Sequence, residues 1–434
     1  MRRFALAVAF AWLCRCKAFA AEPGGPPADA PVARVARLIT EMRSDSFAAR
    51  SHAIAGLEAL GPAARQQLEA AADDPDPEVH LRARELLVRL KMLDLWSAGQ
   101  AKLPAGKVTA GKLLQQLADQ TGNHILLGDQ YGNFHDQEIE LDRPTGEFWS
   151  LVDEVCRKSS NRVRVHYDTR QPGLVVVAGE PAKFPVAYYG PVRAQICSAR
   201  RVFTEVLDYE ELDSELSHTF QLNLQMSWED RFRLVAYRAQ VELASAVTDT
   251  GDELPASQPS GNGWNVASSG TRQLSMSLRL HPPATKAREL DKLVLRWGLV
   301  AVGDMATFDV ANWELGKPYQ QDDVELIVES VQAGADGRYE VTVLVNRDLV
   351  MPDPQEIVFQ ENELELLDLE GRPLRKQGQT NSVIDSGAKM KVTFQAEHDA
   401  SAPATLRLNY PRLRAERDAE LVFRHVPLPV GKPE

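Results

Sequence analysis

The spacing of the hydrophobic positions changes along the chain, and each spacing predicts a different kind of structure. From Val32 to Trp96, leucines and alanines recur every three or four residues, which is the period of a helix buried on one side. Residues 104 to 180 alternate short strand patterns with helical ones, which indicates a small α/β domain. From about Phe184 onward nearly every apolar run has a period of two. The pattern predicts a multidomain α+β protein that ends in antiparallel β-sandwiches.

Helix punctuation divides residues 32–98 into hairpins. Gly61-Pro62 stops one helix and starts the next, and Asp76-Pro77-Glu78 offers an N-cap, a proline in the first turn and an acid near the positive end of the helix dipole. The pattern also repeats after thirty residues. This shift places Ala49, Arg50, Ala53, Leu57 and Leu60 over Val79, His80, Ala83, Leu87 and Leu90. This region resembles HEAT repeats, although His80 stands where that family usually has Arg. The resemblance implies stacked helical hairpins, but only about two units of them.

Residues 104–180 predict strands and helices in alternation. The expected strands are 107–109, 124–127, 139–141, 162–167 and 174–178, and the expected helices are 111–120 and 146–158. This region is similar to the short N-terminal domain shared by secretins and TonB-dependent receptors. The similarity is carried by the segment Leu113 to Gly122, by Ile139 and Leu141, and by the helix from Phe148 to Val155. The pore and barrel domains that usually follow it are absent from this sequence, so the resemblance implies a fold and no direct function.

The remaining chain predicts two Ig-like β-sandwiches, residues 184–315 and 319–430, divided near Leu315-Gly316-Lys317-Pro318. They look like copies of one another. The segment Asp249 to Leu254 matches Asp368 to Leu374 as an Asp/Gly turn followed by leucine, and Leu293, Leu295 and Trp297 answer to Leu406, Leu408 and Tyr410. Each copy is expected to end in an aromatic strand, with Phe308 in the first and Phe423 in the second. The segment from Pro255 to Gly270 predicts an exposed loop within the first.

The N-terminus predicts export. Arg2 and Arg3 precede an apolar run from Phe4 to Leu13 and then Ala18-Phe19-Ala20, the pattern of a cleavable signal peptide over residues 1–20. Residues 21–31 are rich in Pro and Gly and predict a linker. We therefore expect an extracytoplasmic protein, periplasmic or secreted, with no transmembrane segment in the mature chain.

The net charge argues against a nucleic-acid partner, and the cysteine content bears on disulfide formation. The formal net charge is -12, and cleavage after residue 20 would remove four basic residues and make the charge more negative. Because a phosphate backbone is bound by Lys and Arg clusters, a nucleic-acid partner is not expected. After that cleavage only Cys156 and Cys197 remain. They could form a disulfide in an oxidising compartment, and the alternative is two buried free thiols.

No motif for catalysis is found. The sequence has no nucleophile elbow, zinc-protease motif, phosphate-binding loop or dinucleotide fingerprint, and its nine histidines do not pair at metal-ligand spacing. We therefore predict a protein that is not an enzyme and has no cofactor, metal or catalytic residue. Motif searches leave open a hydrolase whose catalytic groups are dispersed over several modules.

Two segments are candidates for ligand contact. Residues from Glu205 to His218 carry six acidic side chains, a composition that can hold calcium, but leucines stand where calcium loops need glycine, so a solvated helix or loop is favoured. Trp264 lies in a Gly- and Ser-rich loop and is predicted to be an exposed ligand-contact residue, with packing back onto its own sandwich as the alternative. Asp249 and Glu253 are expected to form a turn first and to bind a ligand second.

The leading hypothesis is a binding or scaffolding protein of the cell envelope that contacts a protein partner. The alternative is a secreted carbohydrate- or calcium-binding β-sandwich protein that is accessory to polysaccharide handling, with glycan as the ligand.

Overall fold

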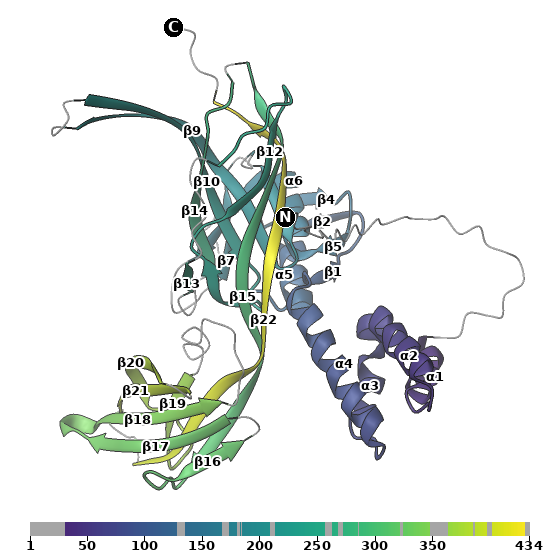
Figure 1. Ribbon diagram of the computed structural model, residues 1–434, viewed down its shortest axis with the longest axis vertical. Coiled ribbons are helices and arrows are strands. Elements are labelled where there is room, and N and C mark those ends of the chain that lie inside the picture. The colour runs from purple at the N-terminus through teal and green to yellow at the C-terminus, as the bar shows by residue number, and fades with distance from the viewer. Residues whose placement is uncertain are drawn as a thin grey trace, which may run out of the picture. The chain divides into compact units, whose positions relative to one another are not determined.

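The computed structural model describes residues 31–127, 135–166, 173–179, 183, 185–208, 213–256, 263–267, 272–284, 286–321, 324–347, 363–384, 387–396 and 402–429 (Figure 1). The expected signal peptide and linker lie outside these residues. The chain is mostly β, with α-helices only before residue 159 in the described part and several separate sheets, as the hydrophobic pattern predicts. It divides into two compact units, Met1–Leu90 and Lys91–Glu434, which are described separately below.

The first unit is helical, with one helix ending before Gly61 and another beginning at Pro77 as the sequence predicts. Its helices are α1 (Pro31–Glu41), α2 (Phe47–Leu60), the 3-10 turn η1 (Gly61–Ala64), α3 (Arg65–Ala71) and α4 (Pro77–Leu95). Asp76 caps α4 by accepting the backbone N–H of Glu78 at 2.9 Å, and Gly61 ends α2 with a φ of 56°. Leu57 and Leu86 are buried in the core of this unit together with Val79.

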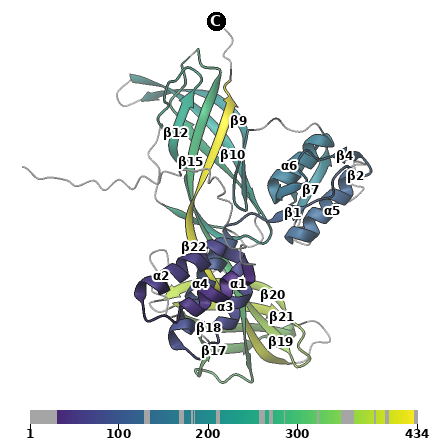
Figure 2. The same cartoon turned by 90° about the vertical axis from the view of Figure 1, so that its right-hand side faces the viewer.

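The second unit begins with the α/β module, residues 99–179. Its elements are β1 (Gln100–Lys102), β2 (Lys107–Thr109), α5 (Ala110–Thr121), β3 (Ile125–Leu126), β4 (Glu138–Glu140), β5 (Thr145–Glu147), α6 (Phe148–Lys158), β6 (Asn161–His166) and β7 (Gly173–Ala178). Strand β1 pairs with β5, β2 pairs with β4, and β3, β7 and β6 form a third sheet in that order. Both helices bury apolar faces in one core, which includes Leu117 of α5 and Val152 of α6 (Figure 2).

The first β module contains β8 (Val186–Tyr189), β9 (Val192–Asp208), β10 (Asp213–Trp228), β11 (Arg233–Arg238), β12 (Glu242–Thr248), β13 (Trp264–Val266), β14 (Gln273–Leu280) and the first part of β15 (Glu289–Ala311). One sheet has the order β14-β10-β9-β8. The other contains β13, β11 and β15, and β12 also pairs with β15. A single core lies between the sheets, with Phe220 from one and Trp297 from the other.

The second β module contains β16 (Pro318–Gln321), β17 (Val324–Ala333), η3 (Ala335–Gly337), β18 (Arg338–Arg347), β19 (Glu363–Asp368), β20 (Arg375–Ile384), β21 (Gly387–Gln395) and the first part of β22 (Pro403–Pro427). Its sheet has the order β16-β17-β18-β21-β20, and β19 pairs with β22 on the other side of the core. Val343 of β18 and Tyr410 of β22 are fully buried between them.

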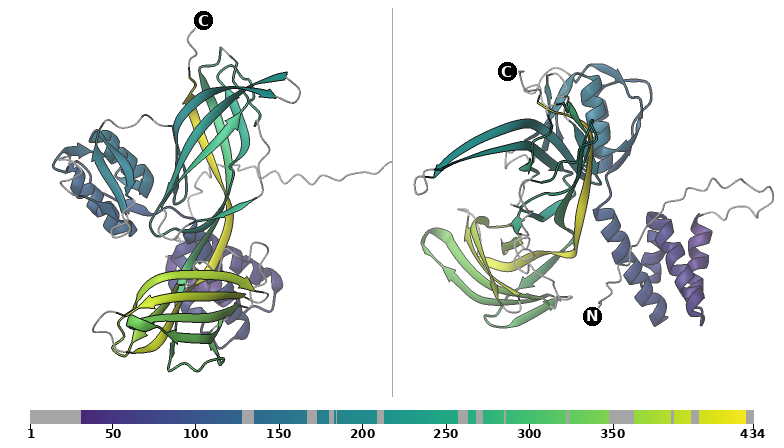
Figure 3. Two further views of the ribbon diagram at one scale, coloured as in Figure 1. Left: turned by 90° about the vertical axis from the view of Figure 1, so that its left-hand side faces the viewer. Right: turned by 45° about the horizontal axis from the view of Figure 1, so that its top comes forward.

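Strands β15 and β22 belong to both β modules, which corrects the expected boundary. They pair from Glu289 opposite Pro427 to Ala311 opposite Thr405, with interruptions at Asp291 and at Asp304 (Figure 3). Phe308, assigned from the sequence to the end of the first copy, packs in the second core, whereas Phe423, assigned to the second copy, packs in the first core. The chain therefore does not separate into two modules at 315–318.

The two Asp/Gly segments form similar hydrogen-bonded turns, in which Thr248 takes the place that Asp368 has in the second module. In the first module Gly251 donates its N–H to Thr248 O at 3.0 Å, and Leu254 donates to Ala246 O at 2.9 Å. In the second module Gly371 donates to Asp368 O at 3.0 Å, and Leu374 donates to Leu366 O at 2.8 Å. The glycines have φ values of 85° and 77°, a left-handed conformation that side chains disfavour. The matching motifs therefore form the same turn twice.

Candidate functional site

A buried carboxylate joins the α/β module to the first β module. Glu229 lies in the turn between β10 and β11, and its side chain has no exposed surface. It accepts the backbone N–H of Gly99 at 2.8 Å and the Nε–H of Arg231 at 2.8 Å. A charge in the interior is tolerated only where donors surround it, and here donors come from both modules. Glu229 therefore links the two modules.

The next residue extends this link. Asp230 accepts the backbone N–H of His124 at 2.6 Å and lies 3.3 Å from Nε of Arg272. Its own backbone N–H is donated to the side-chain oxygen of Asn123 at 2.8 Å. The loop after α5 is thus hydrogen-bonded to the turn after β10 through both backbone and side-chain groups.

A second polar contact lies at helix α6. Trp149 is buried, and its indole N–H is donated to Pro191 O at 2.9 Å. Asp153 accepts two hydrogen bonds from Arg193, at 2.8 and 3.0 Å, and one from the hydroxyl of Tyr188 at 2.6 Å. Burial lowers the pKa of Arg193, but attraction to Asp153 outweighs it and leaves the pKa raised. The buried contact of Trp149 and the partly buried contacts of Asp153 therefore hold the α/β module against β8 and β9.

The long hairpin of β9 and β10 continues past the rest of its sheet. Strand β8 pairs with β9 only at residues 192–195, and β14 pairs with β10 only at residues 220–227. Residues 202–208 and 213–219, which we call the arm, pair with each other, and no other strand of the described chain pairs with them (Figure 3). Phe203 is 72% exposed on the arm and stacks on His218 with ring centroids 4.2 Å apart.

The acidic stretch from Glu205 to His218 coincides with the arm. The expectation of a solvated helix or loop is wrong for most of it, because residues 205–208 and 213–218 lie in the two strands. Side chains 204–217 lie outside the described part of the structure, so the expected calcium ligands are not described.

Trp264 is half-buried, which corrects the expectation of an exposed residue. It packs against the small cluster of Val235 and Val300, and the guanidinium of Arg238 lies 5.1 Å from the centre of its ring. The neighbouring Asn265 lines a pocket of about 410 Å³ at the edge of β14. Further lining residues include Tyr237, Gln240, Met276, Ser277 and Arg279.

Cys156 and Cys197, the two cysteines among the described residues, are free, and no disulfide joins them. Cys156 lies on the buried face of α6, and burial raises the pKa of its thiol. Cys197 is exposed on β9 and accepts a hydrogen bond from the Gln195 amide at 3.4 Å. The expected alternative of two buried thiols holds for Cys156 alone.

The two expected turn acids differ in their surroundings. The carboxylate of Asp249 accepts the backbone N–H of Arg288 at 3.1 Å and so connects the turn to the segment just before β15. Glu253 is exposed beside that turn.

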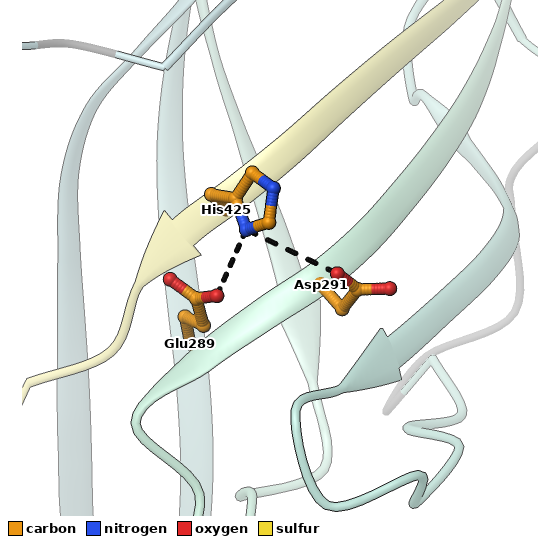
Figure 4. A group of neighbouring side chains, drawn as sticks. All are labelled: Glu289, Asp291 and His425. Atoms are coloured by element: carbon orange, nitrogen blue, oxygen red, sulfur yellow. Dashed lines mark hydrogen bonds and ion pairs between the residues drawn. The ribbon is translucent and has the colours of Figure 1, made fainter.

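A cluster of three possible metal ligands lies beyond Arg288. Glu289, Asp291 and His425 each offer a ligand atom, and these atoms lie within 4.8 Å of one another (Figure 4). Nδ1 of His425 is 2.9 Å from Glu289 Oε1 and 3.9 Å from Asp291 Oδ1. The hydrogen bond to Glu289, followed by attraction to its charge, raises the pKa of His425.

Sequence reasoning missed this cluster and the Glu229 link. Glu289 and His425 are 136 residues apart, so no local spacing connects them, and only the pairing of β15 with β22 brings them together. The alternation Glu289-Leu290-Asp291 at the start of a strand was the available signal, because it puts both acids on one face.

Comparison of the chain with protein-family models, with curated proteins and with solved structures found no match. Within the described residues, no helix combines the length and apolar character that crossing a membrane requires.

Proposed function

We propose that this chain is a non-enzymatic, extracytoplasmic binding or scaffolding protein that contacts a protein partner in the cell envelope. The observation that carries the proposal is the arm, where two strands leave their sheet with both outer edges unpaired in the described structure. An open strand edge offers a row of N–H and C=O groups, to which an extended segment of another protein can add as a further strand. The signal-peptide pattern supports export before this binding.

The chemistry of the arm favours a particular partner. Phe203 offers an exposed aromatic side chain, the residue type that most often anchors a protein interface. The sequence of the same hairpin contains Glu205, Asp208, Glu210, Glu211, Asp213 and Glu215. Acidic side chains around an aromatic anchor attract basic residues and repel acidic ones. We therefore expect an extended partner segment that carries Lys or Arg.

The contacts of Glu229 and Asp153 support the scaffolding part of the proposal. They tie the α/β module to the sheet from which the arm projects. A binding element on a fixed support loses less conformational entropy on association than one on a loose linker. The modules carry the proposed resemblances, which are HEAT-like helices, a secretin- or TonB-type N-terminal domain and Ig-like sandwiches.

Site-specific photo-crosslinking in intact cells tests the proposal. A photoreactive amino acid replaces Phe203 in one variant and Leu315, which is 61% exposed and remote from the arm in sequence, in a matched control. We expect one recurrent protein adduct from position 203 in the envelope fraction and none of that mass from position 315. Equal adducts from both positions, or adducts only in the cytoplasmic fraction, would refute the proposal.

A second candidate function rests on the pocket beside β14. Its polar lining, with Asn265, Ser277 and Arg279, suits the hydroxyl groups of a glycan better than an apolar ligand. Because Trp264 adjoins Asn265, glycan binding should change the tryptophan fluorescence of the protein, and Asn265→Ala should weaken that change. A glycan panel that leaves the fluorescence of the wild-type chain unaltered would eliminate this candidate.

A further inference from the structure

The cluster of Glu289, Asp291 and His425 is built on two paired strands. Glu289 and Asp291 alternate with Leu290 on β15, so both carboxylates extend from the face opposite to this buried leucine. His425 comes from β22, and the pairs on either side of it are Lys292 with Arg424 and Leu290 with Val426. The pair of Asp291 with His425 is missing from the register, and His425 has a positive φ of 50°, so the cluster lies at an irregular position between two otherwise paired strands (Figure 4).

The distances within the cluster suit tetrahedral coordination. Ligand atoms that lie about 2.0–2.1 Å from a tetrahedral zinc ion are separated from one another by roughly 3.3 Å. The His425 nitrogen lies 2.9 Å from the Glu289 oxygen and 3.9 Å from the Asp291 oxygen, which brackets that separation. The third separation, between the carboxylate oxygens of Glu289 and Asp291, is at most 4.8 Å.

The charges of the cluster also favour a cation. Two carboxylates close together repel each other unless a positive charge lies between them. His425 can supply one positive charge when protonated, and Arg424 is the neighbouring basic group. A divalent ion would satisfy both carboxylates at once while neutral His425 acts as the nitrogen ligand.

We propose that Glu289, Asp291 and His425 form a binding site for a first-row divalent metal ion of the zinc type. An imidazole nitrogen suits zinc, copper or nickel, whereas calcium takes six to eight oxygen ligands. Three protein ligands leave a fourth position for water or for a donor from another molecule, and the exposure of Asp291 and His425 leaves that position facing solvent. The ion would fasten the end of β22 to the start of β15.

Calorimetric titration with zinc chloride tests the site. The purified chain carries Cys197→Ser, so that its exposed thiol does not bind zinc, and the variants His425→Ala and Asp291→Asn are compared in that background. The control is His52→Ala, which removes another exposed histidine that lies beside a single carboxylate. We expect binding of one zinc ion, weakened at least about tenfold by His425→Ala and by Asp291→Asn and unchanged by His52→Ala. Calcium chloride should give no heat at this site.

Thermal unfolding gives a second measurement. Zinc should raise the Tm of the parent chain, because an ion that binds only the folded state stabilises it, and should leave the Tm of the His425→Ala variant unchanged. All three ligands lie at the ends of strands on the surface, so the variants are expected to fold, which circular dichroism checks. Absence of one-to-one binding by the parent chain, or equal binding by the His425→Ala variant, would overturn the proposal.

Discussion

The backbone N–H of Gly99 points at the carboxylate of Glu229, and the two groups are 2.8 Å apart in a fully buried contact. Gly99 immediately precedes the first strand of the α/β module, and Glu229 belongs to the first β module. One acidic side chain thereby supplies the hydrogen-bond acceptor that a neighbouring module needs. Removing a carboxylate from such a position is costly, because the donors that it accepts from are then left buried without a partner.

Replacing Glu229 with Ala should therefore destabilise the second unit strongly. The change leaves the Gly99 N–H buried without its acceptor and removes the partner of Arg231. Breaking a buried charged contact costs about 3–5 kcal/mol, and the partial exposure of Arg231 puts the expected loss near the lower end of that range. Urea unfolding followed by tryptophan fluorescence measures it. Glu242→Ala, at an exposed position of β12, is the control and should change stability by less than about 0.5 kcal/mol.

Gly99 itself should tolerate no side chain. A Cβ at this position would lie 2.7 Å from Glu229 Oε2 and 3.1 Å from Cβ of Thr121. Gly99→Ala should lower the free energy of unfolding by about 1–3 kcal/mol, since the modules would have to separate slightly. Gly378→Ala on β20 is the matched control, because a Cβ there meets nothing within 4 Å. Equal stability of the two variants would show that the modules are not in close contact at Gly99.

The repeated turn predicts equal responses in the two β modules. Gly251 and Gly371 both have positive φ, and a Cβ at either position meets nothing within 4 Å. Alanine at either position should therefore cost about 1–2 kcal/mol through backbone strain alone. Thermal melts of Gly251→Ala and Gly371→Ala measure this. A loss at one glycine and none at the other would show that the two turns are not structurally equivalent.

The two cysteines should differ sharply in reactivity. A thiol reagent should modify Cys197 in the native protein at mildly alkaline pH and leave Cys156 unmodified, because Cys156 is buried and its raised pKa keeps it protonated. Peptide mapping by mass spectrometry distinguishes the two sites. In denaturant both should react. A native protein in which neither cysteine reacts, and in which reduction restores both, would show that they form the disulfide that is absent from this structure.

The contribution of His425 to stability should depend on pH in the absence of metal. Its folded-state pKa is raised, first by the hydrogen bond to Glu289 and then by attraction to Glu289 and Asp291, against the opposing charge of Arg424. The stabilisation is therefore complete below the ordinary histidine pKa of about 6.5 and is lost as the pH rises through the raised value. Melts in a chelator should show the Tm difference between the parent chain and His425→Ala shrinking from pH 5 to pH 9. A difference that grows over this range would contradict the assignment.

The sequence predicted elements better than it predicted connections. Helix α5 and strand β2 lie within a residue or two of their expected positions, because hydrophobic period and helix caps act locally. The expected helix at Gly146 starts instead at Phe148, since residues 145–147 pair with β1, a strand that was not predicted. Which strands pair depends on the whole fold, and a strand of three residues is too short for its sequence to indicate its partner.

The candidate sites show the same limit. Phe308 and Phe423 were recognised as buried strand residues but were assigned to the wrong cores, because an alternating pattern indicates that a face is buried and does not indicate against what. Trp264 lies beside two glycines in sequence and nevertheless packs against Val235 and Val300. Long-range strand pairing decides both outcomes.

The ribbon of β15 and β22 has a consequence for synthesis. A ribosome makes the chain from its N-terminus, yet the first core needs Leu421 and Phe423, which are fully buried in it and emerge only after strands β16 to β21 of the second module. Strands β16 to β21 of the second module can pair while the first module still lacks the C-terminal part of β22. The part of the β region that is translated earliest therefore closes last, so a chain that stops before Leu421 would be left with its first module unfinished and open to proteases.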